Sequence, residues 1–368
     1  FDINNFDMLY DFCTEKAIDL VVVGPEVPLV NGVVDFLETK DIRAFGPKKV
    51  PAMLEGSKIF MKDICAQYNI PTARYQNFTE KISAEAYLRK QPLPVVVKAS
   101  GLAAGKGVTI ATTLNEGLNA INDIFNDKFG SGCELVIEDF MDGEEASYFI
   151  FTDGTNYIPL SSAQDHKRIG DGDTGLNTGG MGAYSPAPVF TQAIQDQVNK
   201  EMIEPTLKAM RDLGTPYQGI LYAGVMIKDN YAKLVEYNVR FGDPECQVLV
   251  LRLRSDIVEL ILGTIDGNIH KVHTDWNNNH VATVVMASNG YPGEYKKGTI
   301  IRSLDTAEDL ENIEVFHAGT EFKDNKVLAI GGRVLSITSS DHDLKSALEN
   351  IYSAINTIDW TESTYRKD

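Results

Sequence analysis

A short run of apolar, largely β-branched residues at positions 19–24 restricts this part of the chain to a buried strand. The run suits a parallel strand covered on both faces, because it lacks the alternation of polar and apolar residues that a half-exposed strand shows. The pattern also predicts helices over residues 5–16 and 28–40 and a second short strand over residues 43–46. This alternation of strand and helix predicts a doubly wound α/β sheet, which binds ligands at the carboxyl ends of its strands.

The predicted N-terminal sheet is short. Only two strands are predicted in residues 1–50, and residue 1 is Phe rather than Met. An open sheet normally needs three or more strands for independent stability. We therefore expect residues 1–50 to form an incomplete, truncated N-terminal domain.

The charge of the chain limits its partners. The 368 residues include 34 Lys and Arg against 52 Asp and Glu, a net charge of −18. Nucleic-acid-binding proteins normally present a basic surface to phosphates, so no nucleic-acid partner is expected. No apolar run approaches the ~20 residues of a membrane-spanning helix, so no membrane partner is expected either. The cysteines are scattered without a CxxC pair, which predicts reduced thiols and a cytoplasmic protein.

The remaining sequence predicts several further parts. A helix is expected to begin after Ser57, a residue type favoured at the N-cap, and residues 72–152 form an α+β pattern. Residues 161–188 contain six glycines without periodicity and are predicted to be a long functional loop. The other predicted elements are strands at 95–98, 108–112, 134–138, 221–228, 233–237, 281–286, 299–302, 314–317, 327–330 and 333–338, and helices at 114–127, 191–212, 246–266 and 343–356.

A glycine-rich turn follows the predicted strand that ends at Lys98. It differs from a P-loop, because three residues rather than four separate Gly101 from Gly105, and Gly107 rather than Ser or Thr follows Lys106. Such a turn can fold its backbone N–H groups over phosphates, or it can be a plain hairpin connection. A Lys in a buried strand needs an anionic partner, which a nucleotide phosphate would supply, unless its ammonium reaches solvent.

Residues 164–188 are interpreted as a substrate loop. The GxGxxG match at 170–175 is a false one, because no strand precedes it and its two carboxylates would repel a pyrophosphate. Asp173 could hold an amino group, and Lys167 or Arg168 could shield developing phosphate charge. A solvated charged loop is the alternative.

Glu236 and Asn238 stand two residues apart on a predicted strand, so their side chains share a face. Two hard oxygen ligands suit Mg²⁺ that bridges nucleotide phosphates and keeps several of its waters. Arg240 shares this face and could contact a transferring phosphoryl group. A cross-strand polar row is the alternative. Residues 138–141, at the end of another strand, could offer backbone groups to an adenine edge, although an ordinary acidic turn is also consistent with the pattern.

Several segments together resemble the phosphoribosylamine–glycine ligase family of the ATP-grasp superfamily. They are residues 23–29, 55–58, 98–107, 164–168, 177–186, 236–245, 290–293 and 316–320. The resemblance implies a multidomain α/β and α+β protein in which ATP lies between two α+β subdomains. It also implies a reaction of purine biosynthesis: ATP phosphorylates the glycine carboxylate, and 5-phosphoribosylamine displaces phosphate to give glycinamide ribonucleotide. ATP and Mg²⁺ or Mn²⁺ would be the cofactors.

The resemblance further implies roles for individual residues. The nucleotide-binding residues would be Lys58, Lys98, Gly101, Gly105, Lys106, Gly107, Glu138, Asp139, Phe140, Met141 and Glu145. The substrate-binding residues would be Gly24, Pro25, Glu26, Asp173 and Gly180. Glu236 and Asn238 would be metal ligands. The catalytic residues would be Arg240, Asp173 and Lys167.

The implied domains are an N-terminal α/β domain at 1–50, an ATP-grasp main subdomain at 51–73 and 145–275, a lid subdomain at 74–144, and a small β-rich domain at 276–368. The family begins with a strand and a glycine-rich loop that this sequence lacks. Two alternatives therefore stay open: another ATP-grasp ligase or carboxylase, such as biotin carboxylase, and an ATP-binding fragment that is catalytically incomplete. The sequence does not indicate an oligomeric state.

Overall fold

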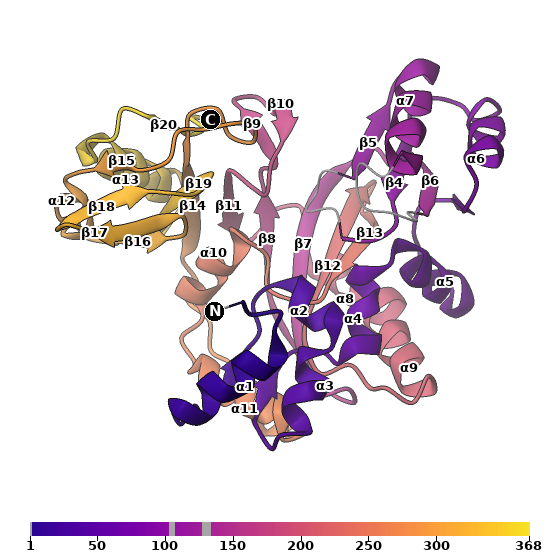
Figure 1. Ribbon diagram of the computed structural model, residues 1–368, viewed down its shortest axis with the longest axis horizontal. Helices are drawn as coiled ribbons and strands as arrows, with labels where there is room; N and C mark the ends of the chain where they lie inside the picture. The colour runs from indigo at the N-terminus through magenta and orange to yellow at the C-terminus, as the bar shows by residue number, and fades with distance from the viewer. Residues whose placement is uncertain (1, 103–106, 127–133) are drawn as a thin grey trace. The chain divides into compact units, whose positions relative to one another are not determined.

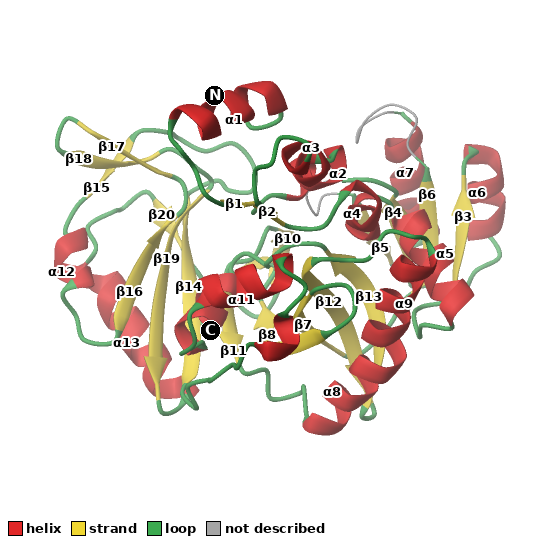
Figure 2. Ribbon diagram, turned by 90° about the horizontal axis from the view of Figure 1, so that it is seen from below, coloured by secondary structure: helices red, strands yellow, loops and turns green. Residues whose placement is uncertain are grey.

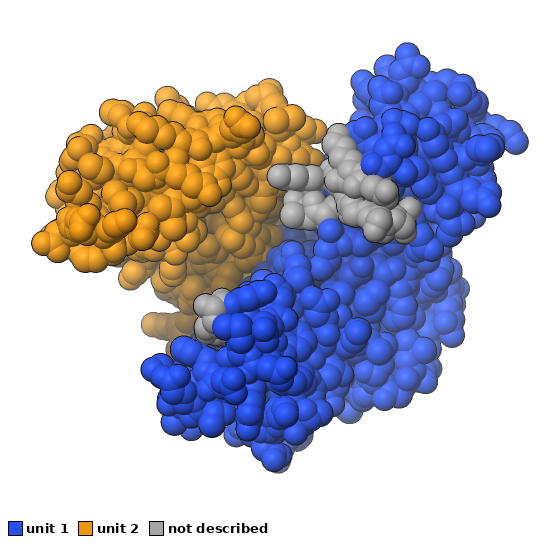
Figure 3. Space-filling view, viewed as in Figure 1, with its two compact units in different colours: residues 1–160, 189–241, 257–272 blue, residues 161–188, 242–256, 273–368 orange. Residues whose placement is uncertain are grey.

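The computed structural model describes residues 2–102, 107–126 and 134–368, so the predicted site residues Gly105 and Lys106 lie outside the described residues. The chain divides into two compact units (Figure 3). Unit 1 comprises residues 1–160, 189–241 and 257–272, and unit 2 comprises residues 161–188, 242–256 and 273–368. Among the described helices, none is both long enough and apolar enough to cross a membrane.

The first part of unit 1 has the predicted α/β order, and its helices are labelled in Figure 1 and its two strands in Figure 2. β1 pairs in parallel with β2, but the prediction that this strand is buried on both faces was wrong, because Val21 is half-buried and Val22 is exposed. The helix predicted over residues 28–40 is divided in two at Gly32, whose φ of 93° ends the first segment. The elements are α1 (Phe6–Glu15), β1 (Val21–Val22), α2 (Glu26–Asn31), α3 (Val33–Glu38), β2 (Ala44–Phe45), α4 (Lys49–Gly56) and α5 (Lys58–Tyr68).

A four-stranded antiparallel sheet follows, in the order β3-β6-β4-β5. Its strands are β3 (Tyr75–Phe78), β4 (Val95–Ala99), β5 (Val108–Ala111) and β6 (Leu135–Asp139), and its helices are α6 (Lys81–Leu88) and α7 (Leu114–Phe125). The two helices pack their apolar faces on this sheet around Leu88, Val97 and Ile121. Thr113 and Glu116 form a capping box that begins α7.

The rest of unit 1 is built on three long antiparallel strands in the order β13-β12-β7. The helix predicted over 191–212 is present, with a π-helical segment at its centre. The elements are β7 (Glu144–Thr152), α8 (Gln192–Val198), the π-helix Asn199–Ile203, α9 (Glu204–Asp212), β12 (Gly219–Lys228), β13 (Tyr231–Asn238), α11 (Ile257–Ile265) and the 3-10 helix Ile269–Lys271.

The prediction that residues 161–188 form a loop was wrong for most of the segment. β8 (Tyr157–Asp165) extends into it, and β9 (Arg168–Gly170), β10 (Thr174–Asn177) and β11 (Gly182–Ser185) lie within it. β9 and β10 pair as a hairpin around Gly172 and Asp173, both of which have positive φ. Glycine and polar residues make up much of these strands, so hydrophobic alternation does not reveal them.

The remainder of unit 2 is a sheet covered by a helix. β11, β14, β19 and β16 are neighbours in that order, and α13 packs against β14, β16 and β19 (Figure 2). A separate sheet has the order β15-β18-β17. The elements are α10 (Glu245–Arg252), β14 (His280–Ser288), β15 (Thr299–Ile301), α12 (Leu304–Glu308), β16 (Ile313–His317), β17 (Thr320–Lys323), β18 (Lys326–Ala329), β19 (Arg333–Asp341), α13 (Leu344–Thr357) and β20 (Ser363–Thr364).

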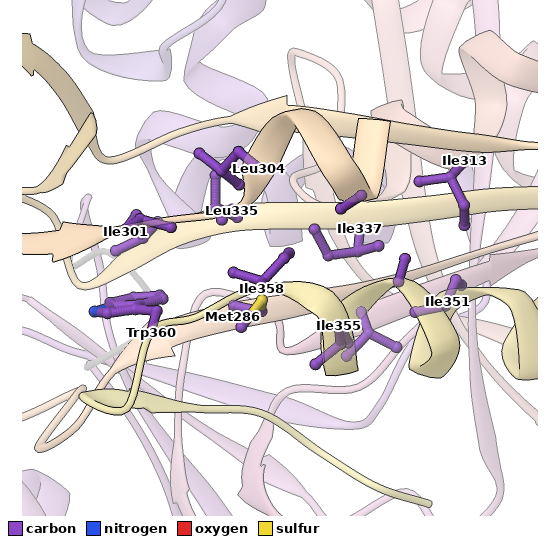
Figure 4. Close-up of a cluster of buried hydrophobic side chains, with 14 of the residues drawn as sticks. Met286, Ile301, Leu304, Ile313, Leu335, Ile337, Ile351, Ile355, Ile358 and Trp360 are labelled. Atoms are coloured by element: carbon purple, nitrogen blue, oxygen red, sulfur yellow. The ribbon is translucent and has the colours of Figure 1, made fainter. Parts of the chain in front are cut away.

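Truncation of a buried side chain in the core of this region is expected to lower the free energy of unfolding measurably. Ile337 is fully buried with Leu335 and Ile355 in the cluster that Figure 4 shows. We expect Ile337→Ala to reduce the free energy of unfolding by about 2–5 kcal/mol, because it leaves a cavity. The matched control is Phe322→Ala on exposed β17, with an expected change within about 0.5 kcal/mol.

Urea unfolding followed by tryptophan fluorescence tests this prediction, because Trp276 and Trp360, the two tryptophans of the chain, both belong to unit 2. Equal losses for the two variants would contradict the assignment of Ile337 to the core.

Candidate active site

A β-bulge positions the predicted metal ligands. In the pairing of β13 with β12 the register shifts between Leu234 and Glu236, so that Val235 is an extra residue. Leu234 is buried before the bulge and Tyr237 is buried after it, whereas Glu236 and Asn238 are half-buried. Without the extra residue, Glu236 would follow Leu234 to the buried face. The bulge therefore turns both oxygen donors to the accessible face of the strand.

These two residues fit a cation that takes its other ligands elsewhere. Among the described residues, no group of three or more His, Cys, Asp and Glu side chains could hold a metal ion. Glu236 and Asn238 supply one carboxylate and one amide oxygen, which suits Mg²⁺ that also binds waters and nucleotide phosphates. These two donors therefore suit a metal ion whose remaining ligands come from water and from a bound nucleotide.

Lys58 lies within the range of electrostatic interaction with Glu236 on this strand. It is the first residue of α5, and the Ser57 hydroxyl accepts a hydrogen bond from Phe60 N at 3.2 Å, which confirms the predicted N-cap. Burial lowers the pKa of Lys58, and the negative charge of Glu236 is the largest influence in the opposite direction. The fold therefore places a predicted phosphate-binding lysine beside a predicted metal ligand.

Lys98 is buried at the end of β4 and is paired with a carboxylate. Its Nζ lies 2.9 Å from Glu138 Oε2, and Lys62 Nζ lies 3.1 Å from Glu138 Oε1. Glu138 therefore supplies an anionic partner for Lys98, a role that was predicted for a nucleotide phosphate. The Glu138 side chain lies among lysines, and the sequence analysis missed Lys62 because nothing local marks a lysine that pairs with a residue 76 positions away.

The rest of the predicted adenine-binding segment has mixed exposure. Arg74 forms an exposed ion pair with Asp139 at 3.0 Å, and Phe140 is exposed. Glu145 is half-buried near the start of β7. Gly101, where the glycine-rich turn begins, has a φ of 118°, a conformation that favours glycine.

Arg240 lies between two carboxylates. Its Nε lies 3.1 Å from Glu26 Oε2, and its Nη2 lies 3.0 Å from Glu55 Oε1. Val239 N donates a hydrogen bond to Glu55 Oε2 at 2.8 Å. Burial raises the pKa of Glu55 to about 7, and the Arg240 charge opposes this shift. Glu26 is the first residue of α2, after Pro25 at the N-cap, so the fold brings together residues predicted for substrate binding and for catalysis.

Glu55 was not among the predicted site residues, although it lies in one of the segments that carry the resemblance. A cluster of one guanidinium and two carboxylates can exchange partners when an anion or a cationic amine enters. At Gly24, two residues before Glu26, an added Cβ would meet no described atom within 4 Å.

The predicted substrate loop belongs to unit 2. Asp173, at the tip of the β9–β10 hairpin, accepts a hydrogen bond from Arg366 Nη1 at 2.6 Å. Arg168 donates to Gly175 O at 2.7 Å and Lys167 O accepts from Thr178 N at 2.7 Å, so both residues brace the hairpin. Arg366 was not among the predicted site residues, because it lies far along the chain without a motif of its own.

Gly180 is the most constrained position of the predicted substrate loop. Its φ is 114°, and an added Cβ would lie 2.4 Å from Pro244 Cδ and 2.7 Å from Asp165 Oδ1. Arg333 donates to Gly179 O at 2.8 Å and to Asp243 Oδ2 at 2.7 Å. The backbone around Gly180 is therefore held in a close-packed arrangement that only glycine permits.

Most of the chain matches one family in three parts. Residues 1–55 match the description "Phosphoribosylglycinamide synthetase, N domain", residues 56–246 match its "ATP-grasp (A) domain", and residues 281–368 match its "C domain". A phosphoribosylamine–glycine ligase of Brucella melitensis is 52% identical over 361 residues, covering 98% of this chain and 84% of its own length. The chloroplastic phosphoribosylamine–glycine ligase of Arabidopsis thaliana is 51% identical over 100% of this chain and 70% of its own length.

Solved structures agree with these matches. The phosphoribosylamine–glycine ligase of Thermotoga maritima has 32% identity and a TM-score of 0.81, over 89% of this chain and 81% of that chain. The biotin carboxylase domain of Hydrogenobacter thermophilus 2-oxoglutarate carboxylase, solved with MgADP, ADP and bicarbonate, has a TM-score of 0.77 over 98% of this chain and 79% of that chain. Its identity of 18% shows the fold alone. The predicted ATP-grasp fold is confirmed.

Proposed function

This chain belongs to the phosphoribosylglycinamide synthetase family, and we propose that the cluster around Glu236, Lys58 and Arg240 performs the reaction of that family. The protein is an ATP-dependent carbon–nitrogen ligase, a phosphoribosylamine–glycine ligase. Its proposed substrates are ATP, glycine and 5-phosphoribosylamine, and its proposed products are glycinamide ribonucleotide, ADP and phosphate. The observation that supports this assignment is that Lys58, the first residue of α5, interacts with the charge of Glu236, which the bulge of β13 turns to the accessible face.

The chemistry needs no covalent enzyme nucleophile. A glycine carboxylate oxygen attacks the γ-phosphorus of ATP, and ADP leaves, which gives glycyl phosphate. The amine of phosphoribosylamine then attacks the carbonyl carbon, phosphate leaves, and the amine loses a proton. A carboxylate is a poor acyl donor, whereas an acyl phosphate carries a good leaving group. The enzyme contributes mainly positioning and charge neutralisation, as in other phosphoryl transfers.

We assign the nucleotide side of the site to unit 1. Lys58 and Lys98 are proposed to bind ATP phosphates, together with Gly101 and Gly107 of the glycine-rich segment. Residues 138–141 are proposed to line the adenine, and Glu145 to bind the ribose. Glu236 and Asn238 would hold Mg²⁺ or Mn²⁺, which supplies positive charge to the phosphates when bound.

In unit 1, the substrate side is assigned to Glu26 and Arg240. Glu26, after Gly24 and Pro25, is proposed to bind phosphoribosylamine. Arg240 is proposed to neutralise the transferring phosphoryl group after that group displaces one of its two carboxylate partners. In unit 2, Asp173 is proposed to orient the glycine ammonium, Lys167 to shield the phosphoryl group, and Gly180 to bring its backbone close to the substrate.

We propose a reducing compartment such as the cytoplasm for this protein. Cys13, Cys65 and Cys246 are free thiols, which are typical of reducing compartments. The Arabidopsis relative is named as chloroplastic.

The substrate requirement gives the direct test. We expect sustained ADP release only when glycine and phosphoribosylamine are both present with ATP and Mg²⁺, because each is consumed in one of the two steps. Coupled measurement of ADP and mass detection of glycinamide ribonucleotide follow the two products. Equal ADP release with bicarbonate in place of glycine would exclude the ligase assignment.

A further inference from the structure

Lys62 is a fully buried lysine that the proposed reaction does not use. It lies on α5, its side chain has no exposed surface, and its Nζ donates a hydrogen bond to Thr72 Oγ1 at 2.7 Å. The same Nζ lies 5.3 Å from the centre of the Tyr75 ring. A buried ammonium is costly unless it is paired, and its charged partner here is Glu138.

Glu138 has a cation at each of its two carboxylate oxygens. Oε1 faces Lys62 Nζ at 3.1 Å and Oε2 faces Lys98 Nζ at 2.9 Å, and the three side chains are between 0% and 6% exposed. Glu138 and Lys98 alone would form a neutral pair with little attraction for a phosphate. Lys62 takes up the charge of Glu138 from the other carboxylate oxygen, which leaves the Lys98 charge available to an anion; with a neutral residue in place of Glu138, Lys62 would have no charge to take up. In a poorly hydrated site the available charge of Lys98 acts strongly on a polyanion.

We propose that Lys62 is a positioning residue for nucleotide binding, which neutralises Glu138 so that Lys98 keeps both its place and its effective charge for the ATP phosphates. The inference rests on the proposed function, because it takes Lys98 to bind those phosphates. Lys62 itself is buried beneath the cluster and acts on the nucleotide through Glu138 and Lys98.

The surroundings of Lys62 fix it relative to the strand that carries the metal ligands. The Thr72 hydroxyl donates in turn to Leu234 O at 2.7 Å, two residues before Glu236 on β13. The Tyr75 hydroxyl donates to Lys62 O at 2.8 Å. Lys62 thus connects the end of β6, where Glu138 lies, with β13. The buried Lys62 side chain therefore fixes the position of Lys98, through Glu138, relative to β13, through Thr72.

A double-mutant cycle on the full chain tests this charge role. We expect Lys62→Met, which keeps the length and removes the charge, to weaken equilibrium ADP binding without metal about 10-fold or more, the loss of about one charge-assisted contact. KM for ATP is expected to rise in parallel, and KM for glycine to stay within about twofold. In the Glu138→Gln background, Lys62→Met is expected to change ADP affinity less than about twofold, because no carboxylate remains to be neutralised.

The reference variant is Lys98→Met, which is expected to weaken ADP binding in any case. Weak binding by Lys98→Met together with wild-type binding by Lys62→Met would overturn the inference and leave the proposed function standing. No ADP binding by the wild-type chain would instead overturn the proposed function. If Lys62→Met does not fold, the comparison of Glu138→Gln with the double variant decides: equal ADP affinity supports the charge role, and a tenfold further loss overturns it.

Discussion

Glu236→Gln is expected to reduce turnover at limiting Mg²⁺ by about 10²-fold or more, since bound metals supply several kcal/mol of charge stabilisation in phosphoryl transfer. The amide keeps the shape of the side chain and removes the negative charge that attracts the cation. The bulge at Val235 places Glu236 on the accessible face of β13, away from the buried side occupied by Leu234 and Tyr237. The substitution should therefore affect metal-dependent activity without affecting the core.

ADP release measured against Mg²⁺ concentration checks this expectation, and the half-saturating Mg²⁺ concentration should rise. Lys233→Gln is the matched control, because Lys233 is an exposed residue of the same strand. It should leave both the Mg²⁺ dependence and the melting temperature unchanged. Wild-type activity of Glu236→Gln at limiting Mg²⁺ would remove Glu236 from the metal site.

Local signals in the sequence predicted much of the fold. The Asp229–Asn230 pair, which lies between two predicted strands, is typical of a turn, and both residues have positive φ in the turn between β12 and β13. Ser57 was expected to cap α5, and it does so. These predictions succeeded because turn and cap preferences depend on a few neighbouring residues and the backbone conformation that they favour.

Contacts between distant residues were beyond the reach of the sequence. The Lys62–Glu138 pair joins α5 to β6, and the Arg366–Asp173 pair joins the last residues of the described chain to a hairpin. No local pattern distinguishes these side chains from solvated charges. The bulge at Val235 was also missed: simple alternation placed Glu236 and Asn238 together correctly, but it could not show that an extra residue is needed to turn them from the buried face.

Arg240→Gln is expected to have the largest combined effect on activity and stability. Loss of a guanidinium that stabilises a transferring phosphoryl group typically costs about 10³-fold or more in kcat. The substitution also leaves Glu55, which is mostly buried, without its ion-pair partner, and loss of one partner of a buried pair costs up to about 3–5 kcal/mol. ADP release and urea unfolding in metal-free buffer measure the two effects separately.

The stability loss should depend on pH, because Glu55 titrates. Burial raises the pKa of Glu55 from 4.5 to about 7, so the stability that its protonated form contributes is complete below 4.5 and is lost as pH rises through 7. Arg240 lowers this pKa, so its removal raises the pKa further and extends the loss to higher pH. At pH 6 both proteins hold Glu55 mostly protonated and differ least. At pH 8 the variant either carries the unpaired Glu55 charge or must bind a proton. This adds about 1 kcal/mol or more to its loss of unfolding free energy, because one pKa unit corresponds to about 1.4 kcal/mol.

Glu55→Gln provides the background that separates this charge effect from simple loss of packing. With no ionisable group at position 55, Arg240→Gln should cost the same free energy of unfolding at pH 6 and pH 8. A pH-independent loss in the wild-type background would mean that Glu55 is not the group responsible. Because the same guanidinium neutralises Glu55 in the free enzyme and is proposed to meet the phosphoryl group during the reaction, the kcat loss should persist in the Glu55→Gln background. The two roles of Arg240 are therefore distinguishable by one pair of variants.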